Sequence, residues 1–179
     1  TFDNPKFIFS FWEITTFSDI WVPMQASPIN GVAYSDCYMA LRWENGKGKL
    51  FDLMQDLEKN GYKSGAWYAG VQFWGQKGVL IQLMDTLSAS LYTGHAFNNA
   101  TGVIIPNNPR DLQAIWAFCS STEYAKAVRK VDQKVCVTSN TLTKIPFDLP
   151  HWQKVAEEQY PNGLPEPHSD DPTQWLFKG

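Results

Sequence analysis

The sequence predicts an α+β fold in which short strands come first, a pair of helices follows, and an extended proline-rich strap forms the C-terminal end. Short runs rich in β-branched and aromatic residues, bounded by turn-forming residues, precede residue 107. Two amphipathic stretches with helix-capping residues occupy positions 108–134. Four prolines between positions 161 and 172 then exclude regular structure. We therefore expect a mixed, short-stranded sheet with a helix pair packed on it.

Strands are predicted by β-branched and aromatic runs at Phe7–Ile14, Val32–Trp43, Gly78–Leu83 and Ala100–Ile105, with a strand end and turn at 92–97. Residues 64–74 alternate small and aromatic side chains among glycines, which fits either a twisted strand or an exposed loop. A helix is predicted between the early strands, because apolar residues recur there at helical spacing and Asn60-Gly61 follows as a stop. The residues of its apolar face are Leu50, Leu53, Met54 and Leu57.

Two further helices are predicted between residues 108 and 134. Asn108 caps the first, Pro109 takes its first position, and Trp116 lies on its apolar face. Ser120 and Glu123 have the spacing of a capping box, so the second helix is expected to begin there. Its expected buried face is Tyr124, Ala127, Val128 and Val131, opposite Lys126, Arg129 and Lys130. A short helix is also expected at 149–158.

Composition limits the class of protein. With 179 residues, 44% of them apolar and 18% charged, the chain is long enough for one buried core and is not expected to be disordered. No apolar run reaches the about 20 residues of a membrane span, and no signal peptide opens the chain, so we expect a cytoplasmic protein without membrane contact. The three cysteines, Cys37, Cys119 and Cys136, lack the paired spacing of zinc sites and fit reduced thiols.

The charge is unevenly distributed around a net value of −3. Residues 1–59 carry five Lys/Arg against eight Asp/Glu, residues 60–147 eight against four, and residues 148–179 two against six. We therefore expect an α+β domain at 1–147 with a basic segment at 60–147, followed at 148–179 by a short helix and an acidic strap. The chain begins at Thr1 and stops soon after an apolar run at 175–177, which predicts a fragment of a longer protein.

Several short blocks resemble, in the same order, the C-terminal target-recognition regions of adenine-specific DNA methyltransferases. These TaqI-like specificity regions occur in restriction–modification and phage-defence enzymes. The strongest block is Thr138–Phe147, a polar turn followed by an Ile-Pro-Phe clip after the helical run. The others are Trp74–Ile81, Leu91–Phe97, Gly102–Pro106, Trp152–Val155, Tyr160–Pro167 and Asp171–Trp175. The resemblance implies that the partners are double-stranded DNA and the catalytic domain of the same parent chain, and that S-adenosylmethionine binds that domain.

Residues for catalysis are not expected in this chain. A methyltransferase needs a glycine-rich cofactor turn and an N/D/S-P-P-Y/F/W motif for the flipped adenine, and the nearest string, Asn4–Phe7, lacks the second proline. There is no G-x-S-x-G motif, and His95, His151 and His168 are scattered. The expectation is a non-enzyme that binds neither cofactor nor metal, since His168–Asp171 fits a solvated loop better than a metal site.

Candidate DNA contacts come from the basic segment. They are Lys77, Lys126, Arg129, Lys130, Ser139, Asn140, Thr141 and Lys144. Lysine and arginine suit phosphates, and hydroxyl and amide groups suit phosphates or base edges. Each has a structural alternative: a solvated helix face for the charges of 126–130, local turn capping for 139–141, and a hairpin tip for Lys77.

Two functions follow from these observations. The first is a non-catalytic DNA target-recognition domain. The alternative is a structural or protein-interaction module that braces the parent enzyme without reading DNA, which the net negative charge and the acidic strap favour. An independent small enzyme is a third possibility, but the sequence offers no convergent acid, base or nucleophile for it.

Overall fold

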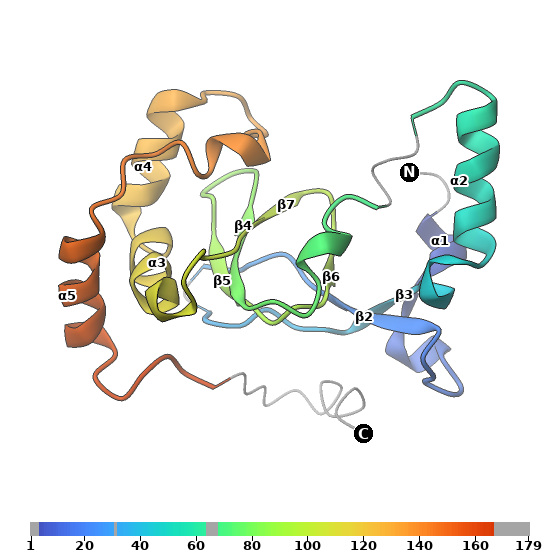
Figure 1. Cartoon of the computed structure of the whole chain (residues 1–179), viewed down its shortest axis with the longest axis horizontal. Coiled ribbons are helices and arrows are strands. Elements are labelled where there is room, and N and C mark those ends of the chain that lie inside the picture. Colours follow the sequence, from blue (N-terminus) through green and yellow to red (C-terminus); the bar gives the residue numbers. More distant parts are fainter. Residues whose placement is uncertain (1–3, 31, 64–67, 167–179) are drawn as a thin grey trace.

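The computed structural model describes residues 4–30, 32–63 and 68–166, and it confirms the mixed α+β class (Figure 1). The strands form two small sheets instead of one. The first sheet lies on the right of Figure 1 with helices α1 and α2, and the second lies centrally with α3, α4 and α5 on its left. Each sheet has its own cluster of buried apolar side chains, so the described chain has two cores.

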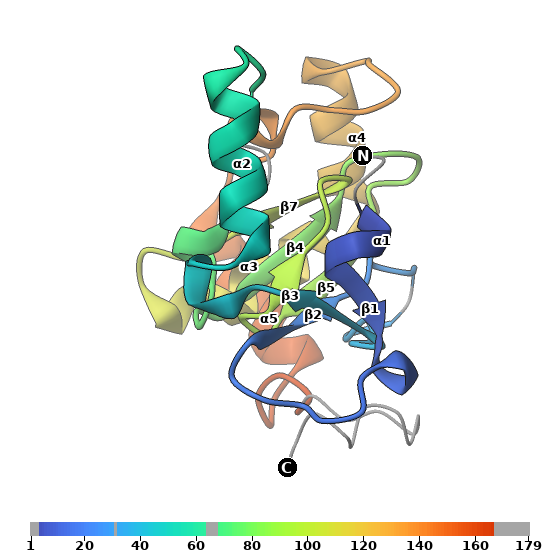
Figure 2. The ribbon, with the colours of Figure 1, turned by 90° about the vertical axis from the view of Figure 1, so that its right-hand side faces the viewer.

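The first sheet has the strand order β1-β3-β2-β6, with the bounds Ile8–Ser10, Met39–Arg42, Trp21–Gln25 and Ala96–Phe97. Neighbours are antiparallel except β2 and β6, which are parallel. Helices α1 (Asn4–Phe7) and α2 (Lys49–Lys59) lie beside it (Figure 2). The predicted helix is thus confirmed. It ends at Lys59 with Asn60 as its cap, before Gly61, whose φ of 80° favours glycine.

The predicted strand at 7–14 is shorter than expected, and the strand β2 was missed. Phe7 ends α1, and Phe11–Glu13 turn into a 3₁₀ helix. The Glu13 carboxylate accepts a hydrogen bond from the Ser10 backbone N–H at 2.7 Å, and this local bond closes the turn. Of the alternating stretch at 64–74, the first four residues lie outside the described residues; the rest forms turns and a 3₁₀ helix at Val71–Phe73, which corresponds to the loop alternative.

The second sheet has the order β5-β4-β7, with the bounds Ala89–Tyr92, Gly78–Gln82 and Thr101–Ile104. Both pairings are antiparallel, and the central strand is fully buried at Val79, Leu80 and Ile81. Gly78 has no room for a side chain, because a Cβ there would lie 2.3 Å from the Ile104 carbonyl oxygen. The two strands predicted at 78–83 and 100–105 are therefore confirmed as neighbours in one sheet.

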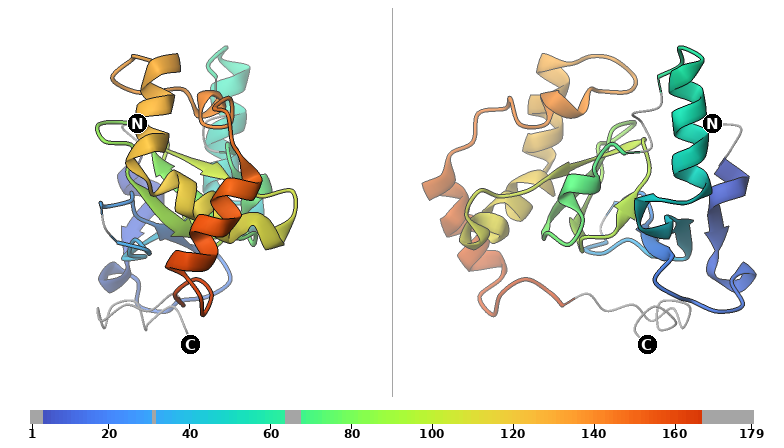
Figure 3. Two further views of the ribbon diagram at one scale, coloured as in Figure 1. Left: turned by 90° about the vertical axis from the view of Figure 1, so that its left-hand side faces the viewer. Right: turned by 45° about the vertical axis from the view of Figure 1, so that its right-hand side comes forward.

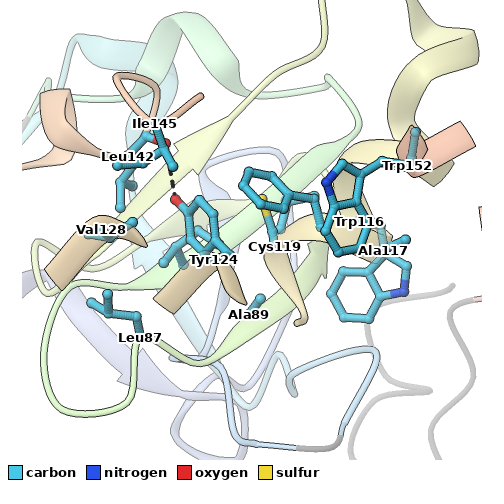
Figure 4. Packing of buried hydrophobic residues seen from close by; sticks show 14 of the residues in the cluster. Leu87, Ala89, Trp116, Ala117, Cys119, Tyr124, Val128, Leu142, Ile145 and Trp152 are labelled. Atoms are coloured by element: carbon cyan, nitrogen blue, oxygen red, sulfur yellow. Dashed lines mark hydrogen bonds between the residues drawn. The ribbon is translucent and has the colours of Figure 1, made fainter. Parts of the chain in front are cut away.

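Three helices lie on one side of this sheet, with the bounds Leu112–Cys119 for α3, Thr122–Val131 for α4 and Leu149–Gln159 for α5, and α3 packs directly against its strands. Helix α5 lies against α3, as the side view shows (Figure 3). Trp116 and Val128 are buried, as predicted, and Trp152 joins them from α5. In the same core the Tyr124 hydroxyl donates to the Leu142 carbonyl at 3.1 Å, which ties α4 to the segment after it (Figure 4).

The caps of the helix pair agree with the prediction at one helix and differ at the other. The Asn108 side chain accepts from the Arg110 N–H at 3.2 Å, as expected for a cap. The cap of α4 is Ser121 rather than Ser120, because the Ser120 hydroxyl donates back to the Trp116 carbonyl at 2.8 Å inside α3. The prediction that Val131 is buried is wrong, since 57% of this last residue of α4 is exposed.

Gln25 ties the two sheets together. Its side chain is fully buried at the end of β2, and its Nε2 donates to the Leu91 carbonyl of β5 at 2.8 Å. Its Oε1 accepts from the backbone N–H of Thr93 at 3.2 Å. Because both ends of the amide are bonded to the second sheet, the parallel contact of β2 with β6 is continued by a buried polar bridge.

The C-terminal strap is described only in its first part. After α5, residues 160–166 have no regular structure, and the Tyr34 hydroxyl donates to the Pro165 carbonyl at 2.8 Å. The remainder of the predicted strap lies outside the described residues. Within the described residues, no helix combines the length and the apolar character needed to cross a bilayer.

The three thiols should differ sharply in reactivity. Cys37 and Cys119 are buried, and burial raises the pKa of the Cys37 thiol to about 12 and that of Cys119 above its usual range. Cys136 is exposed. We expect an aromatic disulfide reagent at pH 8 to modify one thiol quickly and three after denaturation, with Cys136→Ser removing the fast one. Fast modification of two or more thiols in the native protein would contradict this burial.

Candidate nucleic-acid interface

Helix α4 and the segment after it carry most of the predicted contacts. Tyr124 and Val128 turn one face of α4 into the core, which leaves Lys126 and Lys130 on the exposed side. These two lysines are four residues apart, so their Cβ atoms lie about 5–6 Å from each other on one helix face. The arrangement predicted for the two lysines is therefore found, and both are exposed for contact with an anion.

Arg129 has a structural role that the sequence did not reveal. Its guanidinium donates to the carbonyl oxygens of Asp85 at 2.8 Å, of Val135 at 3.4 Å, and of Lys134. Asp85 lies in the turn between β4 and β5, and the other two acceptors lie in the segment after α4. The expectation that Arg129 is a free phosphate contact is corrected, because its donors hold three backbone carbonyls.

The segment at 131–136, which we call the basic loop, is held by a second buried anchor. The Asp132 carboxylate accepts from the backbone N–H groups of Lys134 and Thr138, both at 3.1 Å, and from the Thr141 hydroxyl at 3.2 Å. The N–H of Thr138, followed by that of Lys134, holds the pKa of the Asp132 carboxyl below its usual range. The carboxylate is therefore ionised at neutral pH, and its oxygens face the protein rather than a ligand.

In the polar turn predicted to contact DNA, some side chains are exposed and one is bonded to Asp132. Ser139–Thr141 form a short 3₁₀ helix, in which Ser139 and Asn140 are exposed. Thr141 is only 6% exposed and its hydroxyl donates to Asp132, which is the local turn bonding expected of its structural alternative. Lys144 is exposed a few residues later in the same segment. Ser139, Asn140 and Lys144 remain accessible.

Lys77 lies at the other end of the second sheet. It precedes the first residue of β4, whereas the Asp85 turn that Arg129 holds follows the last. Five strand residues at about 3.3 Å each separate the two ends by about 16 Å. Lys77 is exposed in the connection from the 3₁₀ helix at Val71–Phe73 to β4, so it is not at a hairpin tip. The structure does not bring it together with the α4 lysines.

Lys134 is the basic residue that sequence reasoning missed. It is exposed in the basic loop, three residues after α4 ends, so helical spacing could not group it with Lys126 and Lys130. The Arg129 guanidinium donates to the carbonyl of Lys134, and this bond holds the backbone of Lys134 beside the helix. The exposed basic set of this end of the molecule is Lys126, Lys130, Lys134 and Lys144.

A cavity of about 730 Å³ opens beside this set, between the junction of α3 and α4 and the β4–β5 turn. Trp116, Ser121, Lys126 and Arg129 contribute to its lining. Among the residues that the structure describes, no group of three or more His, Cys, Asp or Glu side chains is placed to hold a metal ion. The lining combines the positive charge of Lys126 and Arg129 with Asp85 and several hydroxyl groups.

Removing the Arg129 guanidinium should loosen the basic loop. We expect Arg129→Met to lower the free energy of unfolding by about 1–3 kcal/mol, because carbonyls that now accept charged hydrogen bonds would lose their partner. Backbone amides at 134–137 should then exchange faster with solvent. Lys130→Met, which removes an exposed charge from the neighbouring position, is the matched control and should leave stability within about 0.5 kcal/mol. Equal effects of the two substitutions would contradict the anchoring role.

Comparison with known proteins gives no relative: no protein-family model matches the chain, and no curated protein matches it significantly.

Proposed function

We propose that this chain is a non-catalytic DNA target-recognition domain that serves an adenine-specific DNA methyltransferase of a restriction–modification or phage-defence system. Its partners are double-stranded DNA and the catalytic domain of that enzyme, which carries S-adenosylmethionine. The proposal rests on the resemblance of the sequence blocks together with the charge arrangement around α4.

One observation supports DNA contact most directly. At the end of α4 the lysine side chains are exposed, while the carboxylate of Asp132 is turned inward and bonded to backbone N–H groups. Asp85 on the adjoining turn is exposed, but Lys126, Lys130 and Lys134 outnumber it, so this end favours the approach of an anion although the chain as a whole has a net charge of −3. In this proposal Lys126, Lys130, Lys134 and Lys144 contact phosphates, and Ser139 and Asn140 reach phosphates or base edges.

The bracing module is kept as a second candidate because of a different surface. Trp12 is 67% exposed, Ile29 63% and Tyr38 40%, all in the acidic N-terminal part of the chain. Ile29 and Tyr38 line the same hollow of about 310 Å³. Exposed apolar side chains around a hollow are typical of surfaces that dock another protein. This surface suits contact with the catalytic domain, and it is compatible with DNA binding at the other end.

Fluorescence anisotropy with a labelled duplex of mixed sequence tests the first candidate. Because the basic set is small, we expect a Kd of about 10⁻⁴–10⁻⁶ M, as for non-specific binding. The affinity should fall steeply with added salt. Failure to bind at low salt, combined with loss of catalytic-domain association in Trp12→Ser and Tyr38→Ser, would favour the brace instead.

A further inference from the structure

The tip of the basic loop exposes apolar side chains among lysines. Val135 is 75% exposed and Val131 57%, and Met84 on the neighbouring β4–β5 turn is 36% exposed. The two segments are joined, since the Val137 N–H donates to the Leu83 carbonyl at 2.9 Å and Arg129 bonds to carbonyls of both. Lys130 and Lys134 stand next to these side chains in sequence and are exposed as well.

Val135 is held outward by its surroundings. The Arg129 guanidinium donates to the carbonyls of residues 134 and 135, and the Lys134 N–H donates to the Asp132 carboxylate. Two residues later, Val137 is 1% exposed and fixes the loop in the core of the second sheet. The backbone on both sides of Val135 is thus anchored, and its side chain is the most exposed of the apolar side chains at this tip.

We propose that Val135 is a wedge that enters a groove of the duplex and partly unstacks one base step, while Lys130 and Lys134 hold the flanking phosphates. Proteins that deform DNA insert apolar side chains between base steps in this way, next to basic residues that bind the backbone. The surrounding charge favours DNA over a protein partner, because the exposed Lys130 and Lys134 outnumber the exposed Asp85 of the adjoining turn and the Asp132 carboxylate faces inward. This inference rests on the proposed DNA binding, and it adds that Val135 deforms the bound duplex.

Two measurements separate the failure of this inference from the failure of the proposed function. Anisotropy reports whether the duplex binds at all. For unstacking, the exposed thiol of Cys136 lies beside Val135, whereas the other two cysteines are buried. A duplex with a disulfide-activated tether can therefore be captured at Cys136, and the tether fixes which base steps lie beside Val135. The base analogue 2-aminopurine, placed at the steps around the tether, is the fluorescent probe of unstacking.

The variants are Val135→Ser, which removes the apolar wedge, and Val135→Ile, which keeps it. We expect 2-aminopurine fluorescence at one step to rise on capture with the native chain and with Val135→Ile, and to stay at the duplex level with Val135→Ser. Untethered Val135→Ser should bind about tenfold more weakly, as expected for losing one buried valine side chain, with an unchanged salt slope. Melting curves should coincide, because the side chain is exposed.

Three other outcomes would overturn the wedge. If the chain binds DNA and fluorescence is the same in native and Val135→Ser complexes, Val135 does not unstack bases and only the proposed function stands. If no duplex binds, both fall. If the native chain self-associates in sedimentation and Val135→Ser abolishes this, the tip is a protein contact.

Discussion

Replacing Lys126, Lys130 and Lys134 together with glutamine is expected to flatten the salt dependence of DNA binding by about 2.7 units in the slope of log affinity against log salt. Each lysine that neutralises a phosphate releases condensed counterions, and this contribution disappears with its charge. The loss should be uniform across DNA sequences, because phosphates carry no sequence information. Anisotropy titrations at several salt concentrations measure the slope.

The matched control removes three lysine charges on the other side of the molecule, near the first sheet. Lys47, Lys49 and Lys59 are exposed at and before α2. Their triple replacement by glutamine changes the net charge equally and should leave the slope nearly intact. If the two triple variants flatten the slope by the same amount, binding is a general response to charge, and the α4 lysines lose their assigned role.

Replacing Trp116 with alanine should lower the free energy of unfolding by about 3–5 kcal/mol, the range for truncating a large buried aromatic side chain. The ring is 5% exposed among side chains of α3 and α5 (Figure 4). Its Nε1 donates to the Tyr160 hydroxyl at 2.9 Å. Denaturant unfolding followed by circular dichroism gives the value.

Two further variants resolve the origin of that loss. Tyr160→Phe removes only the acceptor of the indole N–H and should cost about 1 kcal/mol. Trp12→Ala truncates an equally large ring that is 67% exposed and should cost under about 1 kcal/mol. A Trp116→Ala loss no greater than that of Trp12→Ala would mean that the helix pair does not depend on this ring.

Local patterns predicted the elements whose signals lie within a few residues. Helix α2 with its Asn60-Gly61 stop, the Asn108 cap, and the strands around Val79 and Val103 all follow from spacing and turn chemistry. The division into two sheets did not follow, because it depends on which strands pair across long sequence distances, such as Met24 of β2 with Ala96 of β6. Strand β2 was missed because Pro23 interrupts its pattern.

The candidate interface shows the same limit. Helical spacing placed Lys126 and Lys130 correctly on the exposed face, but it also grouped Arg129 with them. Spacing along one helix carries no information about the carbonyl acceptors at positions 85 and 135. Thr141 was chosen for its hydroxyl, which a buried carboxylate nine residues earlier uses instead. Lys77 was included because it lies between Gly75 and Gly78 in the basic segment, where the backbone can approach a ligand closely, although the sheet separates it from the α4 lysines.

We propose that DNA binds at the end of the molecule formed by α4 and the segment after it. Titrating a short duplex into the isotope-labelled chain and following backbone amide resonances tests this contact residue by residue. Shifts should concentrate at positions 126–144, with Val135 and Asn140 among them, while the amides of β1, β2 and β3 stay in place. Shifts concentrated on those three strands, or a spectrum unchanged at saturating duplex, would contradict it.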